Sequence, residues 1–349
     1  MDVNEMDEVD KALTTLIQDE FPLVEDPYTE LAKRGGLDVS GEEVRQRLEK
    51  LKKAKVIRQI SAIFDSRNMG YKSSLVAVKA KPDEIEKVAK FINRHPGVSH
   101  NYKREHEFNI WYTVAVPPGE DLEKHVNALH EKSGALVTRI LPTLKLYKIG
   151  VKLNLNDTSP EAATQKEKEG GVWNKHLKEA VEMSKDDIAA VRVLQPDLEM
   201  IPEPFKPLAE KMGVSQQELF AKAKELQERA VLRRYAGILH HRKAGFRSNG
   251  MGVWAVPEET VDEMGNKMAQ FKIVSHCYRR PVYEDWRYNL FTMVHGESDD
   301  DCREMIRRMS EDTGLTDYDV LFSVVEFKKT RVEYFEEEDF GWLFDGEAA

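Results

Sequence analysis

Cysteine is scarce in this chain, since only Cys277 and Cys302 occur among 349 residues. Two thiols supply neither a disulfide framework nor a set of zinc ligands, which excludes the small disulfide-rich secreted proteins. Apolar runs are short, and none approaches the roughly 20 residues that a membrane-spanning helix needs. The first ten residues are acidic and lack the basic and apolar segments of a signal peptide. We therefore expect a reduced, cytoplasmic protein without membrane association.

Negative charge is in excess, but it is concentrated at one end of the chain. The formal net charge is −10, and residues 331–349 hold seven acidic residues against one basic residue. That segment contributes −6 and leaves −4 for the remainder. Within it, the predicted tail 336–349 carries Phe340, Trp342, Leu343 and Phe344. The tail is either an anchor that docks these side chains on the body or a solvated acidic end.

One short pattern occurs twice. Residues 100–104 read His-Asn-Tyr-Lys-Arg and residues 276–280 read His-Cys-Tyr-Arg-Arg, each after Val-Ser and separated by 176 positions. Because side chains alternate between the two faces of a β-strand, the His, Tyr and Arg of each copy are expected on one face. This pattern, called the triad below, predicts a candidate site in each half, formed by His100, Tyr102 and Arg104 and by His276, Tyr278 and Arg280.

The repeat extends beyond the triads. Arg67, Gly70, Tyr71 and Lys72 align with Arg242, Gly245, Phe246 and Arg247, and the Asn-Ile-Trp at 109–111 aligns with the Asn-Leu-Phe at 289–291. A repeat of half the chain indicates one duplicated folding unit, so we expect the copies to pack as a pseudo-symmetric dimer within one polypeptide.

Each half predicts the same order of elements. Amphipathic helical segments separated by a turn precede a strand, as in a winged helix-turn-helix, and a β-α-β-β-α-β order follows, as in ferredoxin-like domains. The predicted fold class is therefore α+β with two tandem repeats. The expected segments are two helix-turn-helix-like modules at 1–60 and 179–235, two ferredoxin-like domains at 61–152 and 236–335, a flexible linker at 153–178 and the tail at 336–349.

This order of domains resembles the Lrp/AsnC regulators, and a sharper resemblance covers nearly the whole chain. Residues 98–111 resemble one subunit of siroheme decarboxylase, and residues 276–281 and 285–293 resemble the other. The resemblance implies a fused form of a two-subunit enzyme. It also implies loss of the C12 and C18 acetate carboxyl groups of siroheme, giving 12,18-didecarboxysiroheme for heme or heme d1 biosynthesis. No cofactor is implied, because the iron belongs to the substrate.

The repeated residues suit such a substrate, because a flat macrocycle with eight carboxylates requires several cations and flat apolar surface. Scattered cations are usually solvated, and recurrence in both halves reverses that expectation only for the triad arginines. The candidate substrate-binding residues are Arg67, Lys72, Arg104, Arg242, Arg247, Arg279, Arg280, His240, His241, Trp111, Phe246 and Trp286.

A proton donor is needed where CO2 departs, and histidine is the natural donor near neutral pH. We expect His100 or His276 to be the acid, with Tyr102, Tyr278 and the triad arginines orienting carboxylates. The pair His240-His241 occurs only in the second half and is an alternative source of an acid or an iron ligand. The second-half pocket is therefore favoured. We expect structural roles for His95, His125, His130, His176 and His295, and a buried thiol for Cys277.

Two other functions stay open. A regulator of the Lrp/AsnC type would bind DNA, but the predicted recognition helices open with Glu42-Glu43 and with Gln216-Gln217-Glu218. Acidic residues at these ends repel phosphate, so no DNA is expected. A tetrapyrrole carrier without turnover would use the same pocket. The expected partner is siroheme, with further homo-oligomers possible.

Overall fold

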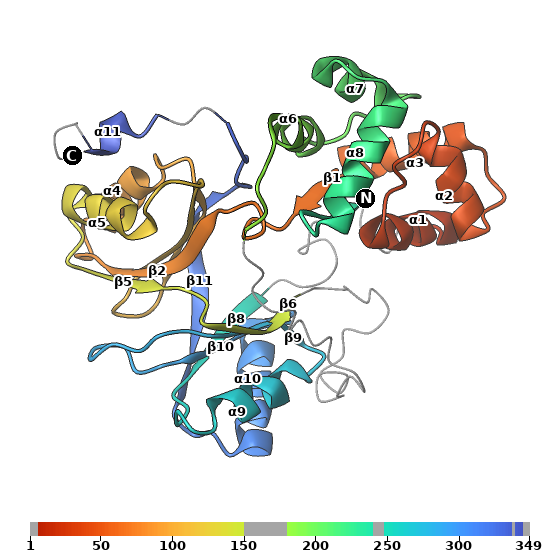
Figure 1. Cartoon of the computed structure of the whole chain (residues 1–349). Coiled ribbons are helices and arrows are strands. Elements are labelled where there is room, and N and C mark those ends of the chain that lie inside the picture. Colours follow the sequence, from red (N-terminus) through yellow and green to blue (C-terminus); the bar gives the residue numbers. More distant parts are fainter. Residues whose placement is uncertain (1–5, 150–179, 240–247, 337–338, 345–349) are drawn as a thin grey trace. The chain divides into compact units, whose positions relative to one another are not determined.

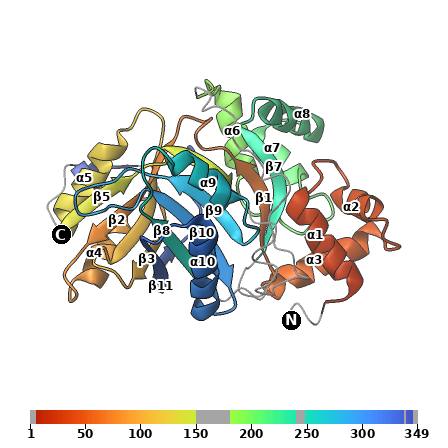
Figure 2. The same cartoon turned by 90° about the horizontal axis from the view of Figure 1, so that it is seen from below.

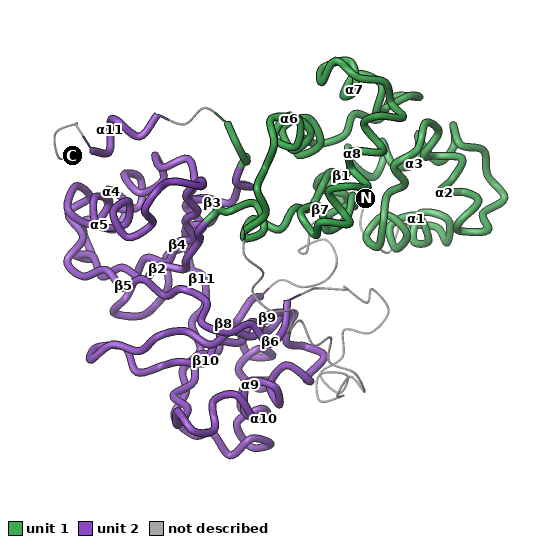
Figure 3. Tube along the Cα trace, viewed as in Figure 1, with its two compact units in different colours: residues 1–71, 179–244, 333–336 green, residues 72–178, 245–332, 337–349 purple. Residues whose placement is uncertain are grey.

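The computed structural model describes residues 6–149, 180–239, 248–336 and 339–344 (Figure 1). The predicted linker 153–178 lies outside these residues. The chain forms two compact units. Unit 1 comprises 1–71, 179–244 and 333–336, and unit 2 comprises 72–178, 245–332 and 337–349 (Figure 3). None of the described helices is long and apolar enough to cross a membrane.

Unit 1 contains both helix-turn-helix-like modules. Side chains of Asp7, Asp26, Ser40, Ser184 and Ser215 cap the amino ends of all its described helices except 206–212, which satisfies otherwise unpaired amide groups. The elements of the first module are α1 (Glu8–Asp19), α2 (Pro27–Gly35), α3 (Gly41–Lys53) and β1 (Ile57–Phe64). Those of the second are α6 (Lys185–Leu194), α7 (Lys206–Met212), α8 (Gln216–Glu228) and β7 (Leu232–Leu239).

The two modules are joined by their strands. β1 pairs antiparallel with β7, so each strand completes the module of the other half rather than folding back on its own. Gly237 of β7 lets α1 approach closely, because a Cβ atom there would lie 2.6 Å from the Cδ1 atom of Ile17. The rings of Phe21 and Phe205 pack on Tyr235 from the two halves, and all three are fully buried.

Unit 2 contains the two β-α-β-β-α-β domains, as the sequence predicts. The first consists of β2 (Lys72–Lys79), α4 (Ile85–Ile92), β3 (Val98–Arg104), β4 (Ile110–Val116), α5 (Leu122–Ser133) and β5 (Val137–Leu141), followed by β6 (Lys145–Ile149). The second consists of β8 (Ser248–Trp254), α9 (Val261–Ala269), β9 (Val274–Arg279), β10 (Leu290–Gly296), α10 (Asp299–Thr313) and β11 (Tyr318–Lys329), followed by α11 (Gly341–Phe344).

The strands of unit 2 form one sheet in the order β5-β2-β4-β3-β11-β8-β10-β9-β6. The long strand β11 pairs with β8 over residues 318–322 and with β3 of the other half over 323–329 (Figure 3). In the same way, β5 pairs with β2 of its own half, and β6 pairs with β9 of the other. Each half thus contributes a strand that pairs with a strand of the other half, which confirms the predicted pseudo-dimer.

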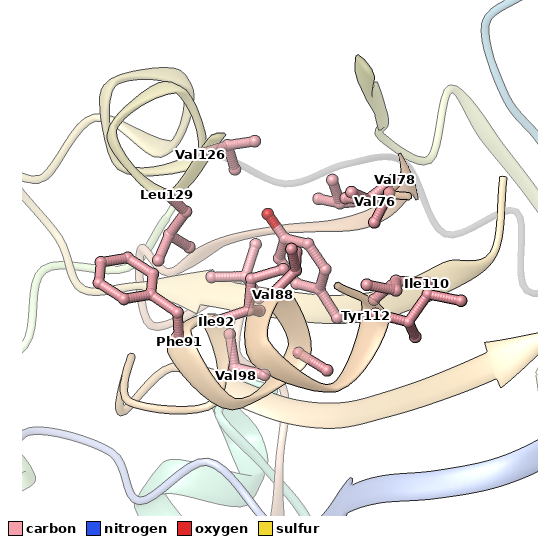
Figure 4. Close-up of a cluster of buried hydrophobic side chains, with 14 of the residues drawn as sticks. Val76, Val78, Val88, Phe91, Ile92, Val98, Ile110, Tyr112, Val126 and Leu129 are labelled. Atoms are coloured by element: carbon pink, nitrogen blue, oxygen red, sulfur yellow. The ribbon is translucent and has the colours of Figure 1, made fainter. Parts of the chain in front are cut away.

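Helices cover one face of each half-sheet, as Figure 2 shows for α9 and α10 beside β8, β9 and β10. Beneath α4 and α5, a core of Val76, Val88, Tyr112 and neighbouring side chains is fully buried (Figure 4). A separate cluster of buried side chains comes from both halves and occupies the faces that the helices leave uncovered. It includes Ala77, Phe108, Trp111, Met251, Val253, Trp286, Phe291 and Leu321.

The end of the chain is anchored on the first half. Leu343 of α11 is fully buried in the core beneath α4 and α5. The guanidinium of Arg94 lies 4.2 Å from the ring centroid of Trp342, and the ring of Phe340 packs against His125 at 4.5 Å. Of the two alternatives for the tail, the structure therefore supports an anchor for residues 339–344.

Candidate active site

The His and Tyr of each triad lie on equivalent strands, β3 and β9 (Figure 3). Arg104 is the last residue of β3, and Arg280 directly follows β9. The ring centroids of His100 and Tyr102 are 6.2 Å apart, and those of His276 and Tyr278 are 6.0 Å apart and stacked. The intervening residue of each strand points the other way, toward the helices. Asn101 donates to the Oδ1 atom of Asn93 next to α4, and Cys277 is buried beside the Gly265 carbonyl of α9. The predicted alternation is confirmed.

A β-bulge precedes each triad. Ser99 is skipped between the pairs Val98–Val114 and His100–Thr113, and Ser275 is skipped between Val294–Val274 and Met293–His276. An extra residue of this kind re-aims its side chain. The hydroxyl of each serine is consequently within hydrogen-bond distance of the Nδ1 atom of the following histidine, at 3.0 Å in the first half and 2.8 Å in the second.

The triad arginines are buried and make equivalent contacts. Arg104 donates through Nη1 to the carbonyl oxygen of Leu321 on β11, and Arg280 donates through Nη1 to the carbonyl oxygen of Leu141 on β5. Leu141 pairs with Leu75 of β2, and Leu321 pairs with Met251 of β8. Met251 occupies the same position in the register of β8 with β10 as Leu75 does in that of β2 with β4. Each arginine therefore reaches from its own half to the strand of the other half.

Neither guanidinium has a carboxylate partner among the described residues, and the Nε atom of each is buried without a hydrogen bond. Arg104 is 6% exposed and Arg280 is 9% exposed. Burial lowers the pKa of both groups to about 10, while the neighbouring Tyr102 or Tyr278 opposes that shift. Both side chains stay cationic at neutral pH. A buried cation without an anion is costly, by several kcal/mol, so these two positions are suited to receive a carboxylate.

Comparison with known proteins assigns both types of module. The model of the AsnC-like ligand binding domain matches residues 68–148 and 243–328, and that of the siroheme decarboxylase NirDL-like HTH domain matches 10–58 and 187–233. The siroheme decarboxylase of Hydrogenobacter thermophilus is 38% identical over 337 residues, which cover 96% of this chain and 97% of that protein. The chain belongs to the siroheme decarboxylase family.

Two further relatives place the chain within the siroheme decarboxylase family. The crystal structure of the siroheme decarboxylase NirDL in complex with an iron-uroporphyrin III analogue matches with a TM-score of 0.75 and 33% identity, covering 96% of this chain and 98% of that one. The siroheme decarboxylase beta subunit of Methanosarcina barkeri is 45% identical over 150 residues, which are 43% of this chain and 99% of that subunit. One half of this chain thus corresponds to a whole subunit, which confirms the expected fused form.

Other residues predicted to bind the substrate of this family have different surroundings. The charge of Arg279 is neutralised by Glu258 and by Asp262, whose carboxylate lies 3.8 Å away, since position 279 points to the helix side of β9. This arrangement argues against a carboxylate-binding role for Arg279. Arg67 lies partly exposed in the turn after β1 in unit 1, and Lys72 is exposed at the start of β2 in unit 2. Their roles stay predictions.

The two predicted aromatic contacts are enclosed in the cluster shared by both halves. Trp111 is 1% exposed and Trp286 is 2% exposed, and their ring centroids are 5.2 Å apart. The indole nitrogen of Trp111 donates to the Phe108 carbonyl, whereas that of Trp286 is buried without a partner. Both rings are therefore enclosed by the shared cluster, and a direct contact with a macrocycle stays a prediction.

Several predicted positions fall outside the described residues, namely His240, His241, Arg242, Phe246, Arg247 and His176. Of the other histidines, His95 and His125 are fully buried and His130 bonds to Thr138, so the structure supports the structural roles expected for them. Burial raises the pKa of the Cys277 thiol, which confirms a buried thiol. No cluster of three or more metal-binding side chains occurs within the described ranges.

Sequence reasoning missed the partners of the triads. The carbonyl groups of Leu141 and Leu321 carry no side-chain signature, so no pattern could have identified them. Ser99 and Ser275 did have a signal, since both triads follow Val-Ser, but the role of the hydroxyl depends on the bulge.

Proposed function

We propose that this protein is a siroheme decarboxylase that removes the carboxyl groups of the C12 and C18 acetate side chains and yields 12,18-didecarboxysiroheme in heme or heme d1 biosynthesis. The observation that carries the proposal is the pair of buried arginines, Arg104 and Arg280, which have no carboxylate partner among the described residues. Arg104 ends the strand of its His and Tyr rings, and Arg280 directly follows the strand of its own. Membership of the siroheme decarboxylase family supplies the substrate.

The arginines explain how a polyanionic substrate is held. Each guanidinium donates one N–H to a main-chain carbonyl oxygen, and its Nε–H has no hydrogen-bond partner. A substrate carboxylate accepting from Nε would form a charge-assisted hydrogen bond, which contributes about 1.5–3 kcal/mol. Because the guanidinium is already desolvated, the gain from pairing is larger than it would be at a solvated surface cation.

The histidines supply the chemistry. In each step the bond between the acetate methylene and its carboxylate breaks, CO2 leaves, and the electron pair left on the methylene carbon and pyrrole takes up one proton to form a methyl group. The acid is a histidine whose position is fixed by the serine at Nδ1 and the stacked tyrosine, with His276 favoured over His100. A positioned proton donor contributes typically about 10²–10⁴-fold to the rate.

Mass spectrometry of siroheme after anaerobic incubation with the protein tests the proposal directly. We expect two successive losses of CO2 at catalytic protein concentrations. A pigment that binds without any change of mass would identify a carrier and overturn the enzymatic assignment.

A DNA-binding function has less support. On α3, Arg45 pairs with Glu42 at 2.6 Å, and Arg47 pairs with Asp7 at 2.7 Å and with Asp10 at 2.9 Å. On α8, Lys222 pairs with Asp187 and Glu225. These cations are neutralised within their own modules, so they offer phosphates little attraction.

The proposal extends to the cofactor, the localisation and the partners of the protein. We expect no cofactor beyond the iron that arrives with the substrate, cytoplasmic localisation and no DNA partner. The fused halves supply the family's subunit pairing within one chain, and assembly into further homo-oligomers is compatible with this arrangement.

A further inference from the structure

A chain of hydrogen bonds leads from the surface of the second half to His276. Asn249 of β8 is exposed, and its Oδ1 atom lies 2.6 Å from Nδ1 of His295 on β10. The Nε2 atom of His295 lies 2.6 Å from the hydroxyl of Ser275, which in turn lies 2.8 Å from Nδ1 of His276. The three strands are neighbours in the order β8-β10-β9, so the chain crosses the sheet along one line.

The equivalent positions of the first half cannot form this chain. The strand register places Ser73 where Asn249 stands and Ala115 where His295 stands, because Ser73 and Ala115 are paired in β2–β4 as Asn249 and His295 are in β8–β10. Ser99 bonds instead to the hydroxyl of Thr113 at 2.8 Å. The link from His276 through Ser275 to the titratable ring of His295 therefore has no equivalent at position 115 of the first half.

The hydrogen positions along this chain have two consistent alignments. When His295 is neutral and donates Nδ1–H to Asn249, its Nε2 atom accepts from the Ser275 hydroxyl, and that oxygen accepts Nδ1–H of His276. When His295 carries a second proton, Nε2–H donates to Ser275, whose hydroxyl now donates to His276 Nδ1. The hydrogen of His276 is then on Nε2. The longer contact of the hydroxyl with the Met293 carbonyl, at 3.3 Å, competes weakly with both alignments.

Decarboxylation requires a supply of protons. Replacing a carboxylate by hydrogen consumes one proton per CO2 released, so siroheme that loses two carboxyl groups takes two protons from the protein. An acid that has given up its proton must regain one before the second step, and a bound macrocycle next to His276 shields it from water.

We propose that His295 is the source of the proton consumed in each decarboxylation. As His276 gives up Nε2–H to the substrate, its Nδ1 atom takes the proton of the Ser275 hydroxyl and Ser275 takes Nε2–H of His295, so the second alignment passes into the first and His295 is left neutral. Before the next step the pair takes up one further proton, and the hydrogen of His276 moves back from Nδ1 to Nε2. This inference rests on the proposed function, in which His276 is the acid. His295 touches no substrate and is a positioning and relay residue. The proposal also gives a physical reason for favouring the second-half site, since the equivalent position of the first half is Ala115, which cannot carry a proton.

The test compares His295→Gln and Ser275→Ala with Ser275→Thr in the full chain. Glutamine retains hydrogen bonding but cannot carry a second proton, alanine removes the hydroxyl, and threonine restores it. We expect kcat to fall roughly tenfold or more in the first two variants, below the roughly 10²–10⁴-fold effect of the acid itself, with siroheme affinity unchanged. The solvent deuterium isotope effect on kcat should rise in both, and Ser275→Thr should recover most of the rate.

A matched control is His130→Gln, because His130 bonds to a single hydroxyl, that of Thr138, on the first half. Its kcat and isotope effect should equal those of the wild type. Wild-type kcat and isotope effect in His295→Gln would overturn the relay, as would a parallel loss of affinity and kcat, which indicates structural damage. Failure of the wild type to release CO2 in the same assay would instead remove the proposed function itself.

Discussion

The guanidinium of Arg280 donates a hydrogen bond to the main-chain carbonyl of Leu141, a residue 139 positions earlier in the chain. The equivalent bond joins Arg104 to Leu321, so the duplication is visible in buried polar contacts as well as in the backbone. Because each bond runs from one half to the other, the position of each cation depends on the correct pairing of the halves. A single-half protein would need a second copy to form either contact.

Replacement of Arg280 by methionine should weaken siroheme binding without lowering the stability of the fold. Loss of the carboxylate contact should raise the Kd for siroheme roughly 10- to 100-fold, given about 1.5–3 kcal/mol for a hydrogen bond to a charged group. The ligand-free protein should be as stable as the wild type or more so. The bond to the Leu141 carbonyl is worth only about 1 kcal/mol net, whereas an unpaired buried cation costs several. Absorbance titration and urea unfolding measure the two quantities.

Arg139→Met is the control for this substitution, because Arg139 forms a partly exposed ion pair with Asp285 at 2.8 Å and should alter neither quantity greatly. Lower stability of Arg280→Met with unchanged siroheme affinity would assign Arg280 to structure alone.

Much of this site follows from the sequence, and the parts that do not have physical reasons. The alternation of a strand correctly placed His276 and Tyr278 on one face. The same rule places Arg279 on the other face, where Glu258 and Asp262 neutralise it, so its assignment to the substrate was inconsistent with the strand period.

The burial of Trp111 and Trp286 could not be inferred in this way. Trp286 lies outside the regular strands, in a short segment held by the bridge between Tyr283 and Trp286, and it is covered by residues from both halves. An exposed aromatic and a core aromatic look alike in a sequence when the covering residues are far away along the chain. The contacts of Ser275 with His295 depend on a bulge and on strand order, which are likewise set by tertiary packing.

His276→Ala should lower kcat by roughly 10²–10⁴ while leaving siroheme binding nearly intact, because a general acid contributes in the transition state. Both CO2 losses should slow together, and His100→Ala should be the milder change, since Ser275 links His276 to the titratable ring of His295 whereas Ser99 bonds to the hydroxyl of Thr113. Rapid-quench mass analysis of the pigment distinguishes the two steps. A product lacking one carboxyl group that accumulates in either variant would instead assign one acetate to each half.

Binding to duplex DNA should be weak and nonspecific even at low salt, because Arg45 and Arg47 of α3 are held by Glu42, Asp7 and Asp10. Fluorescence anisotropy with a labelled duplex, repeated over a range of salt concentrations, measures this. Tight binding whose affinity falls steeply with salt would indicate several phosphate contacts and favour a regulator. The siroheme titration in the same buffer serves as a positive control for folded protein.

Acid should destabilise the protein through His95, which lies beneath the anchored tail. The backbone N–H of Gly97 donates to Nδ1 of His95 at 3.0 Å, so the hydrogen of the neutral ring is on Nε2 and faces Nδ1 of His125 at 2.9 Å. Burial, followed by the charges of His125 and Lys328, lowers the pKa of His95 to about 3. The ring therefore remains neutral in the folded state while it takes up a proton in the unfolded state below about pH 6.5.

The sign of the effect follows from this difference. Stability from neutral His95 is complete above the unfolded pKa and is lost as pH falls toward the folded value, by about 1.4 kcal/mol per pH unit. Between about pH 6.5 and 5 most carboxylates are still ionised, so the slope of stability against pH in this window reflects the protonation of histidine. Urea unfolding across this window should show a shallower pH dependence of stability in His95→Gln than in the wild type. Phe340→Ala should also reduce the slope, because Phe340 packs at 5.2 Å from His95 and keeps water from the ring. An unchanged slope in His95→Gln would show that the unfolded chain gains its protons elsewhere.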